Sequence, residues 1–217
     1  TEMFEQIPRQ HSQRLLPMVR EVMAESALAG DQLSALVVGA GPGSFTGLRI
    51  AASCAQGLAY AWQLPAIAVS TLSVQVNTAM RQGKLLAGDT ALSLVDAHIG
   101  ETYWAVYRVG SSELEQLEGP GINVPGSVQT QSDYPALIAV GSGARYLPQF
   151  SPALRERVIR HYPDLLPHAR DLFPAALVKF ASGELLKPHE IQPLYVRDEV
   201  SWKKLSEQGK PGKRGTA

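Results

Sequence analysis

The chain has 217 residues, of which 45% are apolar and 18% charged, and its 20 basic and 20 acidic side chains cancel. This composition excludes global disorder, because burial of that much apolar surface can offset the entropy lost on folding. The net charge of zero argues against a domain that binds a nucleic acid backbone by itself, since such domains are usually strongly basic. The length suits one large domain or two small lobes.

The single cysteine, Cys54, cannot form an internal disulfide, and no zinc-type ligand spacing surrounds it. No apolar run reaches the roughly 18 residues that a bilayer span needs. The first residues of the chain are polar and do not resemble a signal sequence. We therefore expect a cytoplasmic protein that contacts no membrane.

The first third of the chain alternates predicted helices and strands. Apolar residues recur at helical spacing in residues 11–29, and a β-branched run at 33–38 predicts a buried strand. Residues 45–62 predict a helix rich in small side chains, followed by a strand at 67–69 and a helix at 72–80. This alternation is typical of a layered α/β lobe.

The pattern changes after Gly83, where a second lobe is expected to begin. Residues 91–96 and 101–109 predict an antiparallel hairpin, because the second of them alternates aromatic and β-branched residues. A further strand is expected at 136–140.

The last part of the chain has weaker signals. Residues 110–135 are rich in glycine and proline and predict loops. Short helices are expected at 151–157 and 173–182. The polar tail from Lys203 onward has little apolar surface to bury and is expected to fray.

The glycine-rich loop between the first strand and the second helix is the most informative segment. Its glycines let the backbone turn sharply with its N–H groups outward, as in a phosphate cradle. The residues of this candidate phosphate site are Gly39, Gly41, Gly43, Ser44, Thr46, Gly47 and Arg49. The segment has neither a Gly-Lys-Ser/Thr ending nor GxGxxG spacing, so a tight turn forced by close helix packing explains it at least as well.

Catalytic residues do not assemble from the sequence. Asp96, His98 and Glu101 surround a turn, where two carboxylates can serve acid–base chemistry or hold a metal, but a charged hairpin rim explains them more simply. Ser44 lacks the second glycine of a nucleophile elbow. We therefore expect neither a catalytic residue nor a metal site.

Residues 39–59, GAGPGSFTGLRIAASCAQGLA, resemble the TsaB family, formerly called YeaZ, whose members carry a GxGPGSFTGxRxG-type loop and helix. DAHIGETY, at 96–103, is similar to the family's DARxGEVY hairpin. The resemblance also includes residues 69–72, 140–143, 193–197 and 202–204, and it covers the chain from about residue 11 to residue 202.

The resemblance implies the two-lobed α/β fold of actin, Hsp70 and sugar kinases, known as the ASKHA fold. It places an N-terminal lobe at 1–78, to which 189–206 return, a C-terminal lobe at 79–188, and a flexible tail at 207–217. Family members begin with a strand that ends in an Asp-Thr-Ala type turn and then a hairpin. The sequence carries neither before His11, so we expect the first strands of lobe one to be missing.

The resemblance also implies a place in the synthesis of threonylcarbamoyladenosine beside the tRNA anticodon. In the family, the paralogue TsaD holds the metal and transfers the threonylcarbamoyl group, and TsaE is an ATPase. TsaD's histidine pair is missing here, which implies a non-catalytic scaffold that dimerises with TsaD, or with itself when alone, and supports TsaE and tRNA. It would bind no cofactor independently, and ATP or ADP would enter only in the complex.

Two predicted helices would carry the partner interface. The small side chains of the helix at 45–62 would let the backbone of another helix approach closely. The apolar stripe of the helix at 11–29 would have to be shielded from water by another surface. The interface residues expected are Leu15, Leu16, Val19, Val22, Met23, Ala52, Ala55, Gln56 and Ala59. The alternative is that both helices merely cover their own sheet.

Two other functions stay open. A nucleotide-binding, kinase-like or ATP-hydrolysing protein would use the loop at 39–47, with Ser44, Thr46 and Arg49 on the phosphates. A peptidase has less support, because the sequence offers no catalytic triad or metal set for it.

Overall fold

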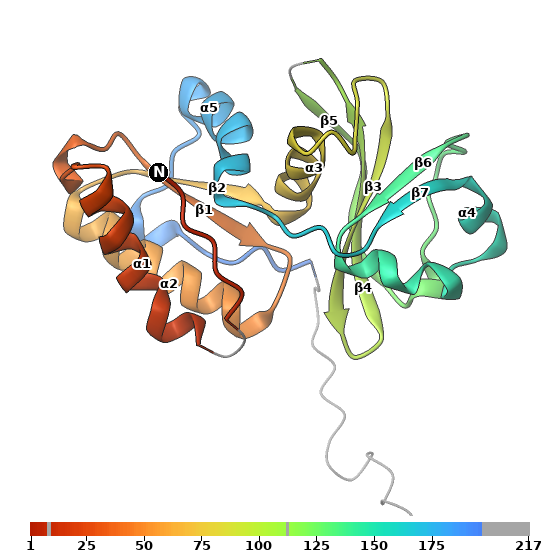
Figure 1. Cartoon of the computed structure of the whole chain (residues 1–217), viewed down its shortest axis with the longest axis horizontal. Helices are drawn as coiled ribbons and strands as arrows, with labels where there is room; N and C mark the ends of the chain where they lie inside the picture. The colour runs from red at the N-terminus through yellow and green to blue at the C-terminus, as the bar shows by residue number, and fades with distance from the viewer. Residues whose placement is uncertain (8–9, 112, 197–217) are drawn as a thin grey trace, which may run out of the picture.

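The computed structural model describes residues 1–7, 10–111 and 113–196, which form two parts, each built on its own β-sheet (Figure 1). The expected two-lobed α/β architecture is confirmed. The tail predicted at 207–217 and the family match at 202–204 lie outside the described residues.

The first part contains a two-stranded parallel sheet. β1 (Leu36–Gly41) pairs with β2 (Ala66–Ser70), and α2 (Phe45–Trp62) connects the two strands. α2 has the bounds that the sequence predicts, because the Ser44 side chain accepts a hydrogen bond from the Gly47 backbone N–H and caps its first turn. β1 begins later than predicted and continues into the glycine-rich loop, where Gly41 still pairs with Ser70.

The first helix, α1 (His11–Glu25), lies beside α2 (Figure 1). It ends before the predicted residue 29, and the chain turns at Ala27, whose φ is 51°. Gln10 is the N-cap residue, and its side chain makes no capping hydrogen bond.

α3 (Thr71–Arg81) follows β2 without a loop and lies between the two sheets (Figure 1). Leu72 and Val76 belong to the apolar cluster of the second part, whereas Val74 packs in a cluster with Ile67 of β2. α3 is therefore buried on most of its circumference. The buried residues are Leu72, Val74, Gln75, Val76, Asn77, Thr78 and Ala79.

The second part contains a five-stranded sheet in the order β5-β4-β3-β6-β7. The strands are β3 (Thr90–His98), β4 (Glu101–Val109), β5 (Leu114–Asn123), β6 (Leu137–Val140) and β7 (Val158–Tyr162). β3 and β4 form the predicted antiparallel hairpin, and β6 lies parallel to β3. α3 covers one face, while η3 (Ser142–Gln149) and α4 (Pro152–Arg157) cover the other.

The prediction of loops over 110–135 is wrong for β5, and β7 was not predicted. The glycines of β5 suggest a loop, yet each meets a tertiary requirement of the sheet. A Cβ at Gly121 would lie 2.7 Å from the indole ring of Trp104, and Gly119 has a φ of +86°. β7 is a short edge strand with mostly exposed side chains, so it lacks an apolar signal.

α5 (Phe173–Ser182) falls inside the range assigned to the C-terminal lobe, but it packs on β2 through Ala176. Leu186 also bridges to Ala66. The chain therefore returns to the first sheet before residue 189, earlier than the predicted boundary. Within the described ranges, no helix is both long and apolar enough to cross a membrane.

Candidate functional site

The glycine-rich loop joins β1 to α2 at the junction of the two parts. Gly41 has a φ of +111°, and a Cβ there would lie 2.8 Å from Leu48 Cδ1, so this position requires glycine. Gly43 has open space around it. The tight turn expected from the sequence is thus localised at Gly41.

A cavity of about 270 Å³ lies where this loop meets α3, β3 and η3. Gly43, Ser44 and Gly47 line it from the loop, and Val95 and Ser142 line it from the second part. The remaining lining residues are Pro42, Leu48, Thr71, Gln75, Leu165, Leu166 and Pro167. All of these described residues are uncharged, so the wall supplies hydroxyl groups and an amide but no cation for a phosphate.

Gln75 fixes the α3 side of this cavity. Its buried amide nitrogen lies 2.9 Å from Ser93 Oγ, 3.2 Å from the Leu94 carbonyl and 2.8 Å from the Val140 carbonyl. Gly141 has a φ of +96°, and a Cβ there would lie 2.0 Å from Gln75 Nε2. These contacts join α3 to β3 and β6. Gln75 was not predicted from the sequence, because α3 also contains polar residues such as Asn77 and Thr78, and its pattern does not single out a buried glutamine.

The loop residues predicted to act together divide between two surfaces. The Arg49 guanidinium stacks on the Phe45 ring, 3.9 Å from its centroid. Thr46 and Arg49 line a separate hollow of about 450 Å³ on α2, together with Phe45, Ile50, Ser53 and Cys54. Arg49 therefore adds no charge to the cavity at the junction, which counts against the single phosphate site expected from the sequence.

The carboxylate of Asp96 is engaged within the fold. It accepts hydrogen bonds from the His98 backbone N–H at 2.8 Å and from the Tyr146 hydroxyl at 3.0 Å. The latter bond raises the pKa of Tyr146. The Asp96 backbone N–H donates to Ser142 Oγ at 3.0 Å. Asp96 thus fastens the β3–β4 hairpin to η3, and the described residues contain no group of three or more histidine, cysteine, aspartate or glutamate side chains placed to hold a metal.

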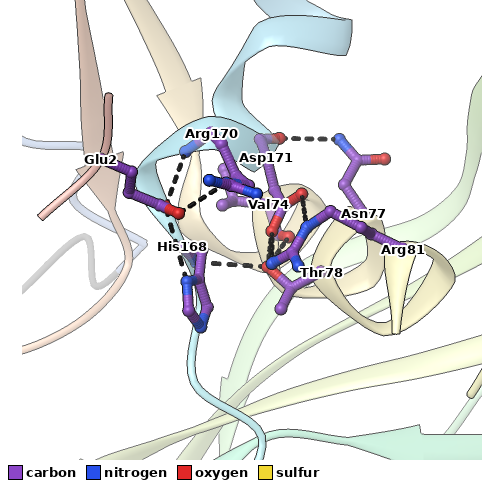
Figure 2. A network of polar contacts seen from close by, with 8 residues as sticks. All are labelled: Glu2, Val74, Asn77, Thr78, Arg81, His168, Arg170 and Asp171. Atoms are coloured by element: carbon purple, nitrogen blue, oxygen red, sulfur yellow. Dashed lines mark hydrogen bonds and ion pairs between the residues drawn. The ribbon is translucent and has the colours of Figure 1, made fainter. Parts of the chain in front are cut away.

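A second polar network joins α3 to the segment before α5 (Figure 2). Asp171 in η4 (Ala169–Leu172) accepts two hydrogen bonds of 2.8 Å from Arg81 and one of 2.7 Å from the Thr78 hydroxyl. Asn77 Nδ2 donates to the Asp171 carbonyl at 3.1 Å. Burial raises the pKa of Asp171, but the bonds from Arg81 and Thr78 outweigh it and hold that pKa below its usual value. The network is structural and was not predicted from the sequence.

The small-residue face of α2 points inward. Ala52, Ala55 and Ala59 are buried in a cluster with Val38 and Ala66. This corrects the expectation that these alanines face a partner: their small side chains instead let α2 approach its own two strands closely. The outer face carries Phe45 and Tyr60, which are 55% and 80% exposed.

Gln56, expected at the interface, donates a hydrogen bond of 2.8 Å from Nε2 to the Ile191 carbonyl. It ties α2 to the returning chain.

The apolar stripe of α1 is only partly covered by the rest of the chain. None of the residues of α1 is buried, and Leu16 is 48% exposed. Leu15, Val19, Val22 and Met23 are half-buried. Among the described residues, the exposed large apolar side chains of α1 and α2 are Leu16, Phe45 and Tyr60. We call the surface that carries them the helix face.

The family model of TsaD, described as tRNA N6-adenosine threonylcarbamoyltransferase, matches residues 5–151. This range includes the glycine-rich loop, α3 and the β3–β4 hairpin. Together with the two sheets, the match defines a TsaD-type protein of the ASKHA fold class.

Curated relatives and a solved structure narrow this class. "tRNA threonylcarbamoyladenosine biosynthesis protein TsaB" of Escherichia coli K12 is 37% identical over 97% of this chain and 88% of its own length. TsaB of Haemophilus influenzae is 32% identical over 94% and 87%, respectively. The structure of YeaZ from Pseudomonas aeruginosa has a TM-score of 0.80 and 35% identity, and the match covers 89% of this chain and 87% of that one. The chain belongs to the TsaB (YeaZ) family.

Proposed function

We propose that this protein acts in tRNA threonylcarbamoyladenosine biosynthesis as a non-catalytic scaffold in the cytoplasm. It dimerises with the metal-bearing paralogue TsaD and supports the binding of TsaE and tRNA. The names of the curated relatives support the pathway, and the match to the TsaD model supports a pairing between two related chains.

The observation that carries the scaffold role is the helix face. α1 is amphipathic, yet none of its residues is buried, and the exposed Phe45 and Tyr60 lie on the neighbouring α2. An apolar helix stripe that its own chain covers only in part is typical of a surface that packs on another protein. When TsaD is absent, a second copy of this chain covers the same face.

The cavity at the junction favours a scaffold over the nucleotide-hydrolysing alternative. Its described lining is uncharged, and Arg49 is stacked on Phe45 outside it. A site that binds and cleaves a phosphate anhydride needs positive charge directed at the phosphates. ATP or ADP therefore enters through the assembled complex, and this subunit binds no cofactor independently.

The test is the oligomeric state of the protein, measured by size-exclusion chromatography with light scattering, alone and mixed with TsaD of the same organism. We expect a heterodimer to replace the homodimer. Leu16→Asp should abolish both, because it places a charge in the apolar stripe. Leu86→Asp is the matched control, since Leu86 is 65% exposed and lies outside the helix face.

A chain that remains monomeric and ignores TsaD would contradict the proposal. Calorimetry with ATP then tests the alternative: binding by the isolated protein that Ser44→Ala and Thr46→Ala weaken would favour a nucleotide-binding function of the glycine-rich loop.

A further inference from the structure

A pocket outside the junction cavity lies where the N-terminal residues meet the end of β7 and the turn after α3. Its volume is about 460 Å³, which is within the range of pockets that hold a small molecule. The lining includes the rings of Phe4, Tyr162 and His168 and the charged side chains of Lys84 and Asp164. We call it the edge pocket, because β7 is an edge strand of the second sheet.

Phe4 and His168 form an aromatic stack in the edge pocket. Their ring centroids are 4.4 Å apart, and the ring planes are inclined by only 10°. Glu2 holds this segment in place, because its carboxylate lies 2.5 Å from Arg170 Nε and 3.5 Å from His168 Nδ1 (Figure 2). Phe4 is nevertheless 45% exposed, so its ring has area left on which another flat ring can stack.

Two cations flank an aromatic ring where β7 meets the edge pocket. The Lys84 ammonium lies 5.2 Å from the centroid of the Tyr162 ring. Arg160 is on the same face of β7 as Tyr162, because side chains two positions apart along a strand point the same way. Arg160 lies 3.7 Å from Asp89, whereas none of the ion pairs among the described residues involves Lys84. The charge of Lys84 is therefore available to an anionic ligand.

We propose that the edge pocket binds one unpaired nucleotide of an RNA strand. Proteins bind unstacked bases on aromatic rings and through hydrogen bonds to the base edges, while cations contact the phosphates. Phe4 supplies the ring, and Lys84 supplies the cation. Gln6, Gln82 and Asp164 line the same pocket, and their amide and carboxylate groups are suited to the donors and acceptors of a base edge.

The charge of the neighbouring surface favours a strand over a free nucleotide. Residues 145–161 lead through α4 and β7 to the edge pocket and contain four arginines and one glutamate, in a chain whose net charge is zero. Adjacent phosphates of a strand reach this segment, whereas a single nucleotide does not. Because the whole chain is not basic, it holds one nucleotide and not a long stretch of RNA. That this RNA is a tRNA rests on the proposed function.

NMR titration of the isolated chain with a single-stranded oligoribonucleotide tests the proposal, because chemical shifts report weak binding residue by residue. We expect shifts at the edge pocket. Phe4→Ala should raise the dissociation constant about 10-fold, as for the loss of one stacked base. Phe4→Trp keeps a ring and should retain the affinity. Lys84→Gln should raise the dissociation constant about 5-fold at low salt and lower its logarithmic salt dependence by about 0.7, the value for one phosphate contact.

Phe180→Ala and Lys179→Gln are the matched controls. Phe180 is 43% exposed, close to the value for Phe4, and both residues belong to α5 and lie outside the edge pocket. Both controls should leave the affinity unchanged. Free AMP, titrated in the same way, should bind more weakly than the oligoribonucleotide, because it reaches none of the arginines.

The proposal is overturned if the unaltered chain shows no shifts at the edge pocket, or if Phe4→Ala and Lys84→Gln bind as tightly as the controls. Equal affinity for AMP and the oligoribonucleotide would also overturn it, in favour of a site for a free nucleotide. None of these measurements uses TsaD, so their failure leaves the scaffold role intact. A chain that binds the oligoribonucleotide but does not pair with TsaD would remove the proposed function and keep the RNA site.

Discussion

α1 and α3 are both amphipathic helices of the TsaB-family chain, but their surroundings differ. α3 lies between the two sheets and buries seven residues, from Leu72 to Ala79. α1 lies beside α2 and buries none. Periodicity alone predicts both helices, yet only the surroundings distinguish a helix that completes the core from one that offers a surface to a partner. The first is expected to determine stability, and the second association.

Gly141→Ala should give the largest effect, because it disturbs the attachment of α3 to the second sheet. The new Cβ would lie 2.0 Å from Gln75 Nε2 at a φ of +96°. Overpacking and backbone strain together should lower the free energy of unfolding by about 4 kcal/mol. Urea denaturation measures this value, and Gly43→Ala, which meets open space, should lower it by less than about 1 kcal/mol. Similar losses in the two variants would contradict the role assigned to Gln75.

Leucine truncations compare the two helices directly. Leu72→Ala removes a fully buried side chain and should lower the free energy of unfolding by about 3 kcal/mol. Leu16→Ala should change the stability of the monomer by less than about 0.5 kcal/mol, since Leu16 is 48% exposed. The measurement is chemical denaturation at a concentration where the protein is monomeric. A large loss in Leu16→Ala would show that α1 is part of the core.

Asp171→Asn tests the polar attachment of α3. The bonds from Arg81 and Thr78 hold the pKa of Asp171 below the ordinary value of 3.8. The ionised carboxylate therefore stabilises the fold fully above pH 3.8, and this contribution is lost as the pH falls through the lower pKa of the folded state. At pH 7 the variant should be less stable by about 2 kcal/mol.

Denaturation across the acid range checks the sign of this effect. The difference between the variant and the unaltered protein should shrink as the pH falls below 3.8. A difference that is independent of pH would mean that the asparagine disturbs packing instead.

Local signals predicted much of the fold. α2 and β4 have the predicted bounds, because a serine cap starts the helix and alternating aromatic and β-branched residues mark the strand. β5 was missed because its glycines are explained by contacts across the sheet, as at Gly121 beneath Trp104. A glycine required by a neighbouring strand cannot be distinguished in the sequence from one that makes a loop.

The candidate site was predicted less well than the fold. The small residues of α2 were recognised, but they were predicted to face a partner, whereas they pack on the protein's own first sheet. The spacing of residues identifies a stripe on a helix but not the surface against which that stripe packs. Gln75 and Asp171 act through partners far away in the sequence: Gln75 bonds to Val140 and Asp171 to Thr78. Such contacts exist only once the chain is folded. The motif at 39–47 identified the family, although its side chains face two different surfaces.

The position of α3 has a consequence for the way the molecule unfolds. Its residues belong to the apolar clusters of both parts, and it follows β2 without an intervening loop. Neither sheet can complete its core while α3 is unfolded, although each has its own set of strands. The two parts are therefore expected to lose structure in one cooperative transition, so that a partner that stabilises one part protects the other as well.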